Sequence, residues 1–192
     1  MTFTRTLLGT AAATALLAFG TGAHAALTMT TPACTASILT PTYTACGGSF
    51  DGNNKNQSAD VNAYIASTFG SGYTVSGSSD DAGTFGPFTS NPTGTTGTLT
   101  FDSSIDGAFV LALKAADQFS LFYYDGAGPA ISSINFSTLG VAVNSSGIPN
   151  GLSHATLYAG PMTPPVPEPE TYALMLGGLG LVGWMARRRQ RG

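Results

Sequence analysis

This sequence has little charge, and basic residues are fewer than acidic ones. Only 9% of its 192 residues are charged. Between residues 26 and 166 the only basic side chains are Lys55 and Lys114, against eight aspartates and no glutamate, so this stretch has a net charge of −6. Two lysines cannot form a basic patch, and nucleic acid is therefore not an expected partner. Solubility must come from Ser, Thr, Asn and Gly, a composition that fits an extracellular β-rich module.

The N-terminus has the three parts of a secretory signal. Arg5 supplies the positive charge, residues 7–19 are apolar, and Ala23-His24-Ala25 is a small-residue cleavage site. We expect a signal peptide over residues 1–25, cleaved between Ala25 and Ala26. A permanent N-terminal anchor is the alternative. His24 belongs to the expected signal peptide and is not a candidate for any active site.

Cysteine is scarce too, since Cys34 and Cys46 are the only two. In an exported protein an even pair predicts a disulfide. It would close a 13-residue loop and stabilise the fold by about 3 kcal/mol in the chain-entropy description. Only His154 remains as a further soft ligand, so we predict neither a zinc site nor any other metal or cofactor.

The C-terminus combines three features in a fixed order. Val166-Pro167-Glu168-Pro169 is extended and hydrated, because each proline fixes its own φ and restricts the residue before it. Residues 172–186 form an uncharged run of 15 residues, shorter than the about 20 of a full helical span. A basic cluster follows, made of Arg187, Arg188, Arg189 and Arg191.

This order predicts a transmembrane helix over residues 172–186 with its arginines in the cytoplasm. The alternative is a C-terminal core helix. It is disfavoured because the arginines that follow directly would have to leave the core.

The tail resembles the PEP-CTERM sorting signal of Gram-negative bacteria, through Pro167-Glu168-Pro169, the Leu/Gly-rich residues 174–184 and the arginine cluster. The resemblance implies exosortase as a partner, a membrane-embedded protease that acts at or near the motif. It also implies a precursor anchored in the inner membrane, delivery to the cell surface or extracellular matrix, and a host that makes extracellular polysaccharide.

The hydrophobic pattern of the body changes from helical to strand-like along the chain. Ser58 is placed to cap a short helix in which Val61, Ile65 and Phe69 recur at helical spacing, ended by Gly70. Residues 71–97 are predicted to form a long loop that contains a weak strand at 73–76. Apolar runs bounded by Gly, Asn or Pro then predict strands around residue 99 and at 108–114, 118–124, 131–136, 141–143 and 152–158.

Together these patterns predict a mainly β protein: an antiparallel β-sandwich or jelly-roll-like domain with one short helix over residues 26–163. A sorting tail with its transmembrane helix follows over residues 164–192. The core should consist of the apolar side chains that face inward in these strands: Leu99, Phe101, Phe109, Leu111, Leu113, Phe119, Leu121, Tyr123, Ile134, Phe136, Val141, Val143 and Leu157.

Two acidic clusters invite a calcium interpretation. Asp51 and Asn53 alternate in the turn 51–56, but Lys55 stands where a third oxygen ligand belongs and no glutamate follows. Asp80-Asp81 lies in a Gly/Ser loop, where backbone carbonyls would have to supply the other ligands. A solvated turn is the favoured interpretation of both clusters.

Catalytic motifs are equally sparse. Ser153 and His154 are adjacent on a predicted strand and must point to opposite faces, so they cannot be nucleophile and base together. Tyr123, Tyr124 and Tyr158 could form a sugar-stacking platform, although strand aromatics more often pack in cores. We therefore name no catalytic residue.

The function predicted from the sequence is that of a non-enzymatic, surface-sorted structural or matrix-associated protein. A carbohydrate-binding module for the host's extracellular polysaccharide is the alternative, and a secreted hydrolase ranks third.

The signal peptide gives a direct prediction. The exported protein should begin at Ala26, because Ala23-His24-Ala25 presents small residues at the cleavage positions. Edman sequencing of the exported protein checks this, and a sequence starting at Met1 would establish the N-terminal anchor instead.

Overall fold

The computed structural model describes residues 26–81 and 84–161, together with Gly178. The predicted signal peptide, the Pro-Glu-Pro motif, the arginine cluster and the predicted span 172–186 apart from Gly178 therefore lie outside the described residues. Within the described residues, no helix has both the length and the apolar character that crossing a membrane requires.

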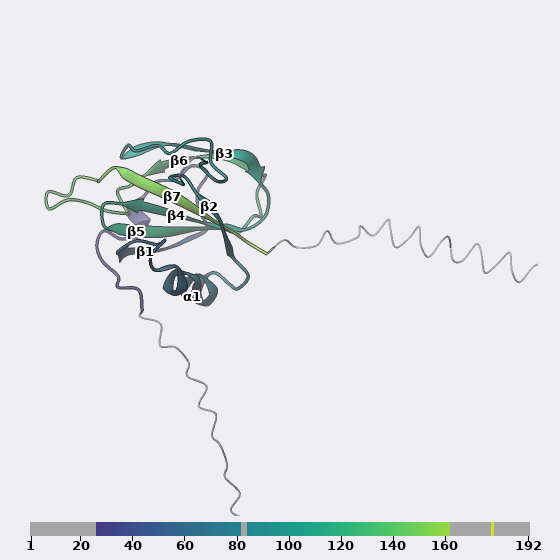
Figure 1. Cartoon of the computed structure of the whole chain (residues 1–192), viewed down its shortest axis with the longest axis horizontal. Helices are drawn as coiled ribbons and strands as arrows, with labels where there is room; N and C mark the ends of the chain where they lie inside the picture. Colours follow the sequence, from purple (N-terminus) through teal and green to yellow (C-terminus); the bar gives the residue numbers. More distant parts are fainter. Residues whose placement is uncertain (1–25, 82–83, 162–177, 179–192) are drawn as a thin grey trace, which may run out of the picture.

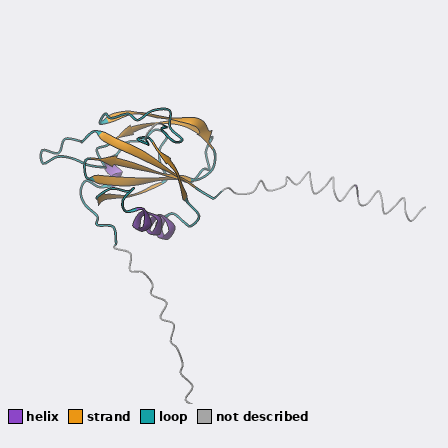
Figure 2. Ribbon diagram, viewed as in Figure 1, coloured by secondary structure: helices purple, strands orange, loops and turns teal. Residues whose placement is uncertain are grey.

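The body is built from seven strands and one α-helix among the described residues (Figures 1 and 2). In chain order they are β1 (Ala45–Asp51), α1 (Ser58–Thr68), β2 (Thr74–Ser78), β3 (Thr96–Ile105), β4 (Phe109–Ala115), β5 (Gln118–Tyr124), β6 (Ile131–Ser137) and β7 (Leu152–Ala159). A 3-10 turn, η1 (Cys34–Ala36), precedes β1.

All strand pairs are antiparallel and form two sheets. The larger has five strands in the order β1-β5-β4-β7-β2, and the smaller pairs β3 with β6. The smaller sheet lies on one side of the larger and α1 on the other (Figure 1). The mainly β, antiparallel prediction with one helix is confirmed. The division into five and two strands differs from the eight strands of a jelly roll.

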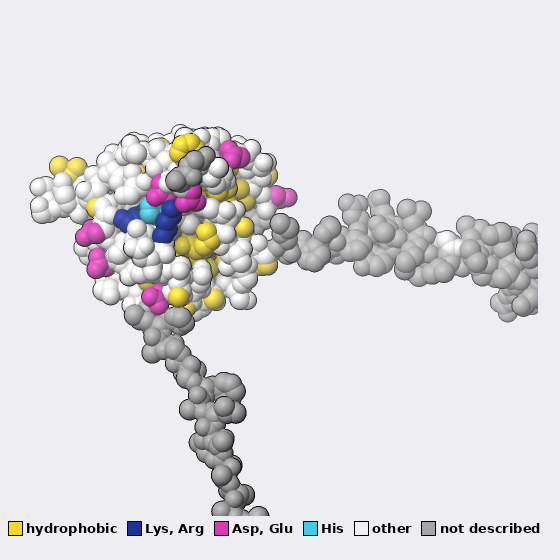
Figure 3. Space-filling view, viewed as in Figure 1, with side chains coloured by type: hydrophobic (Ala, Val, Ile, Leu, Met, Phe, Trp, Pro, Cys, Tyr) yellow, Lys and Arg dark blue, Asp and Glu magenta, His cyan; other side chains and the backbone are white. Residues whose placement is uncertain are grey.

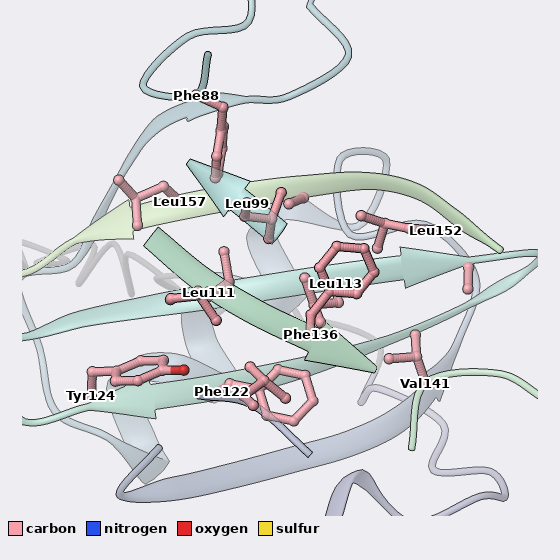
Figure 4. Packing of buried hydrophobic residues seen from close by; sticks show 14 of the residues in the cluster. Phe88, Leu99, Leu111, Leu113, Phe122, Tyr124, Phe136, Val141, Leu152 and Leu157 are labelled. Carbon is pink, nitrogen blue, oxygen red and sulfur yellow. The ribbon is translucent and has the colours of Figure 1, made fainter. Parts of the chain in front are cut away.

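The central strand β4 is buried along its whole length because both faces of the large sheet are covered. Phe109, Leu111 and Leu113 point into the core shared with β3 and β6, much of which Figure 4 shows. Val110 and Ala112 point into a second core under α1. Side chains alternate along a strand, so a continuous apolar run fits only a strand that is covered on both sides.

Helix α1 forms where the apolar spacing predicted it. Val61 and Ile65 are fully buried against the large sheet. Ser58 is the first helical residue rather than the cap, and Gln57 at the cap position makes no side-chain capping bond. Gly47 of β1 leaves the space for Tyr64, because a Cβ there would lie 2.5 Å from the tyrosine hydroxyl.

Three sequence expectations need correction. Residues 45–51, for which no strand was predicted, form strand β1, because β5 offers them a free edge. Residues 141–143 do not form a strand, because the amides of Val141 and Ala142 bond the Thr138 carbonyl in a turn and Val143 makes only an isolated bridge with Pro149. Among the expected core residues, Tyr123 and Val143 are only half-buried, whereas the others are buried.

The N-terminal segment is fastened to both sheets. Cys34 and Cys46 form the predicted disulfide, with their Cα atoms 6.0 Å apart. Ser37 Oγ donates to the carbonyl of Ser137, the last residue of β6, at 2.7 Å. Thr40 exchanges two backbone hydrogen bonds with Asn135 and so covers the outer edge of β6. An edge covered in this way offers no template for a foreign strand.

The two-sided core predicts a large cost for truncation in β4. Leu111→Ala should lower the free energy of unfolding by about 2–5 kcal/mol, because it removes a fully buried side chain from a close-packed core. Leu139→Ala is the control, since this leucine is 39% exposed and its loss should matter by about 0.5 kcal/mol or less. Urea denaturation of both variants decides the matter, and equal destabilisation would contradict the assignment of the core.

Candidate functional site

Three segments that the sequence left separate meet at one place in the fold. The turn after β1 brings Asn54 and Lys55, the loop after β2 brings Asp80 and Asp81, and β7 brings His154. We call these five side chains, with Ser78 and Thr156, the polar network. In Figure 3 basic, acidic and histidine side chains gather on one face of the molecule.

Lys55 joins the two aspartates. Its Nζ lies 2.6 Å from Asp80 Oδ1 and 2.9 Å from Asp81 Oδ1. Burial would raise the pKa of Asp80, but hydrogen bonds from Lys55 and Ser78 outweigh it and hold that pKa below its usual value. The bond from Lys55 likewise lowers the pKa of Asp81. The two carboxylates and the ammonium are therefore all charged at neutral pH.

His154 forms the buried end of the network, with only 3% of its surface exposed. Its Nε2 lies 3.0 Å from Asn54 Oδ1, and Asn54 Nδ2 donates to Thr156 Oγ1 at 2.9 Å. An amide oxygen only accepts, so Nε2 carries the proton in this arrangement. Nδ1 then faces Asp80 Oδ2 at 3.4 Å. Burial lowers the pKa of His154 despite the opposing effect of Asp80, and the histidine is neutral at pH 7.

Lys114 is the cross-strand partner of His154. It is buried to 8% exposure, and its ammonium donates to the backbone carbonyl of Ala116. Burial lowers the pKa of Lys114, while Asp117 opposes the shift. Both lysines of the body therefore lie near the same histidine, and each adds to the cost of protonating it.

Ser153 does not join this chemistry. It sits at a register shift of β7 and is exposed, whereas His154 is buried. The two adjacent side chains therefore lie in different environments, one exposed and one buried. The Ser153 carbonyl accepts a bond from Asn91 Nδ2 at 3.1 Å.

The expected acidic turns have protein partners. Asn53 Oδ1 accepts the backbone N–H of Lys55 at 3.0 Å, which closes the turn, and Asp51 is exposed. Asp80 and Asp81 are held by Lys55 rather than merely solvated. In the described parts of the chain, no three His, Cys, Asp or Glu side chains are grouped as a metal ion would need.

A pocket of about 300 Å³ opens beside the polar network. Its walls combine buried polar groups, the exposed lysine and aspartate, and two larger side chains: Asn54, Lys55, Ser58, Val75, Ser78, Asp81, Thr156 and Tyr158. A second pocket of about 290 Å³ lies around the loop that joins β5 to β6 and includes Asp125 but no basic residue. Pockets near 300 Å³ are at the small end of ligand sites.

The three tyrosines do not form a stacking platform. Tyr124 and Tyr158 are buried in the two different cores. Tyr123 is half-buried and its ring stacks on Phe69 at 5.3 Å between centroids. Sequence reasoning did not reveal that the side chains of the polar network meet at His154. The available signal was that polar residues His154 and Thr156 interrupt an otherwise apolar strand.

The buried histidine predicts an acid-sensitive fold. Because the pKa of His154 is lower in the folded state than the usual about 6.5, the unfolded chain takes up its proton first. Stability should therefore be fully present above pH about 6.5 and decline as the pH falls below it. The low pKa values of Asp80 and Asp81 add a second loss below pH about 4.

Urea denaturation between pH 7.5 and 5.0 tests this, with His154→Gln as the comparison. The variant keeps a side chain that can bond Asn54 but cannot titrate, so it should lose the decline between pH 6.5 and 5.0. Identical pH dependence in both proteins would contradict the role of His154.

The comparisons with known proteins assign only the tail. Residues 165–189 match the family model described as the PEP-CTERM protein-sorting motif. No curated protein and no solved structure matches the chain. The match includes Val166-Pro167-Glu168-Pro169 and three of the four predicted anchor arginines, while Arg191 lies beyond it. The chain therefore carries a PEP-CTERM protein-sorting motif, as its tail indicated.

Proposed function

We propose that this is an exported protein that exosortase processes at its PEP-CTERM motif and that serves a structural, non-enzymatic role at the cell surface or in the extracellular matrix. The observation that carries the proposal is the motif at residues 165–189, which directly follows the folded body. The Cys34–Cys46 disulfide supports export, because such bonds persist in oxidising compartments.

The order of events follows from the chain. The signal peptide starts export, and the apolar run 172–186 then halts in the inner membrane with Arg187, Arg188, Arg189 and Arg191 in the cytoplasm. β7 ends at Ala159, so only a short Pro-rich segment separates the body from the motif. Two prolines keep Pro167-Glu168-Pro169 from pairing into the body, which leaves it accessible to a membrane-embedded protease.

A binding function is the second candidate. The pocket beside Lys55 combines a few convergent polar groups with apolar walls, which is typical of small-molecule sites. Its mixture of donors and acceptors favours a carbohydrate-binding module for the host's extracellular polysaccharide. Sedimentation of the exported protein with that polysaccharide, and with an unrelated one, distinguishes this role from a purely structural one.

The sorting proposal predicts a mass difference between strains. With exosortase present, the surface or secreted protein should lack the residues that follow the cleavage point, and without exosortase the full tail should remain. Mass spectrometry of the exported protein measures both. A full-length tail in both strains would show a permanently membrane-anchored protein.

Glu168→Ala should impair this processing and leave the body folded, because described residues between Leu27 and Tyr158 form both hydrophobic cores of the body. Glu170→Ala is the matched control, since it removes the same charge just outside Pro167-Glu168-Pro169. Equal processing of both variants would show that the motif glutamate is not recognised.

A further inference from the structure

We propose that the pocket beside Lys55 and Asp81 binds a single neutral sugar residue through two neighbouring hydroxyl groups. The inference rests on the carbohydrate-binding candidate above and gives it a place and a ligand class. It is independent of the sorting role of the tail.

The ion pair at the rim supplies a donor and an acceptor side by side. Lys55 Nζ and Asp81 Oδ1 lie 2.9 Å apart, and the two side chains are 33% and 45% exposed. An ammonium has three N–H donors, of which Asp80 and Asp81 use two. Among the described residues, each carboxylate oxygen of Asp81 accepts one side-chain or backbone bond, from Lys55 or from the Ser78 amide, which leaves it a further lone pair toward that part of the chain.

A sugar hydroxyl both donates and accepts, as Ser and Thr hydroxyls do. One hydroxyl can therefore donate to Asp81 while its neighbour on the ring accepts from Lys55. Bonds to charged partners are stronger than neutral ones. This pairing uses the groups that the polar network leaves free.

The rest of the pocket fits the carbon face of one ring. Val75 on the edge strand β2 is 52% exposed, and it lines the pocket together with the buried Tyr158. Apolar side chains of this kind can cover the C–H face of a sugar. A volume of about 300 Å³ is at the lower end for ligand sites, which favours one residue over an extended chain.

The polar part of the pocket is rigid before any ligand arrives. Asn54, Ser78 and Thr156 are at most 2% exposed, and each is hydrogen-bonded within the network. A site held in this way loses little conformational entropy on binding.

The local charge selects against acidic sugars. One ammonium faces two carboxylates in the network, and the body around it carries a net charge of −6. An anionic residue such as a uronic acid would meet like charge on approach and in the pocket. The preferred ligand is therefore a neutral hexose.

Saturation-transfer NMR on the exported protein tests the site with glucose, galactose, mannose and glucuronate as probes. We expect at least one neutral hexose to bind more tightly than glucuronate. Val75→Trp should abolish the signal by filling the pocket without touching the polar network. Lys55→Met should weaken binding at least about tenfold by removing the charged donor. Asp125→Asn in the second pocket is the control and should bind as the wild type does.

Thermal melts show whether each variant is folded. Should Lys55→Met unfold, Val75→Trp alone decides the question, because its side chain is outside the network. A hexose signal that survives Val75→Trp places the sugar elsewhere and overturns this site while keeping the carbohydrate-binding candidate. If glucuronate binds more tightly than every hexose, the ligand class is wrong. If neither the probes nor the host polysaccharide bind, both this site and the carbohydrate-binding candidate are wrong.

Discussion

Burial of the large sheet on both faces is the constraint on which the rest of the body depends. Strand β4 lies in the middle of the sheet with no exposed residue, so each of its faces needs a cover. The β3–β6 pair covers one face with Leu99, Phe101, Ile134 and Phe136. On the other face α1 contributes Val61 and Ile65. Neither cover has a core of its own, and both are stable only against the sheet.

The polar network follows from the limited length of the helix. Val110, Ala112 and Lys114 alternate along the α1 face of β4, paired with Tyr158, Thr156 and His154 of β7. Helix α1 covers the apolar part of this face. The turn before the helix covers the remainder, and its Asn54 bonds both His154 and Thr156. The bonds of Asn54 to His154 and Thr156 fix one arrangement of the loops rather than adding much net stability.

The body and the tail contribute different features to the protein. The tail carries the recognised signal at residues 165–189. The body presents a disulfide, partly bridged sheet edges and a face on which Lys55 pairs with Asp80 and Asp81. Isolated backbone bridges from Met29, Thr40 and Phe88 cover part of three sheet edges, and such contacts hinder pairing with a foreign strand.

The sequence by itself determined whatever depends on local pattern. Helix α1, strands β4 to β7, the disulfide and the sorting motif could be predicted because spacing, residue type and order along the chain carry the information. Strand β1 could not, because Ala45–Asp51 has two consecutive glycines and becomes a strand only beside β5. The expected strand at residues 141–143 is absent for a related reason, since Val141 and Ala142 are buried without strand pairing and Val143 makes only an isolated bridge.

Tertiary structure alone decided the candidate site. Asn54, Asp80 and His154 are far apart in sequence, and no local pattern links a turn, a loop and a strand. They meet because β7 pairs with both β4 and β2, which brings the loop after β2 and the turn before α1 over one end of the sheet. Only that register places a histidine between an amide and a carboxylate, and the resulting burial, rather than the residue's identity, keeps it neutral.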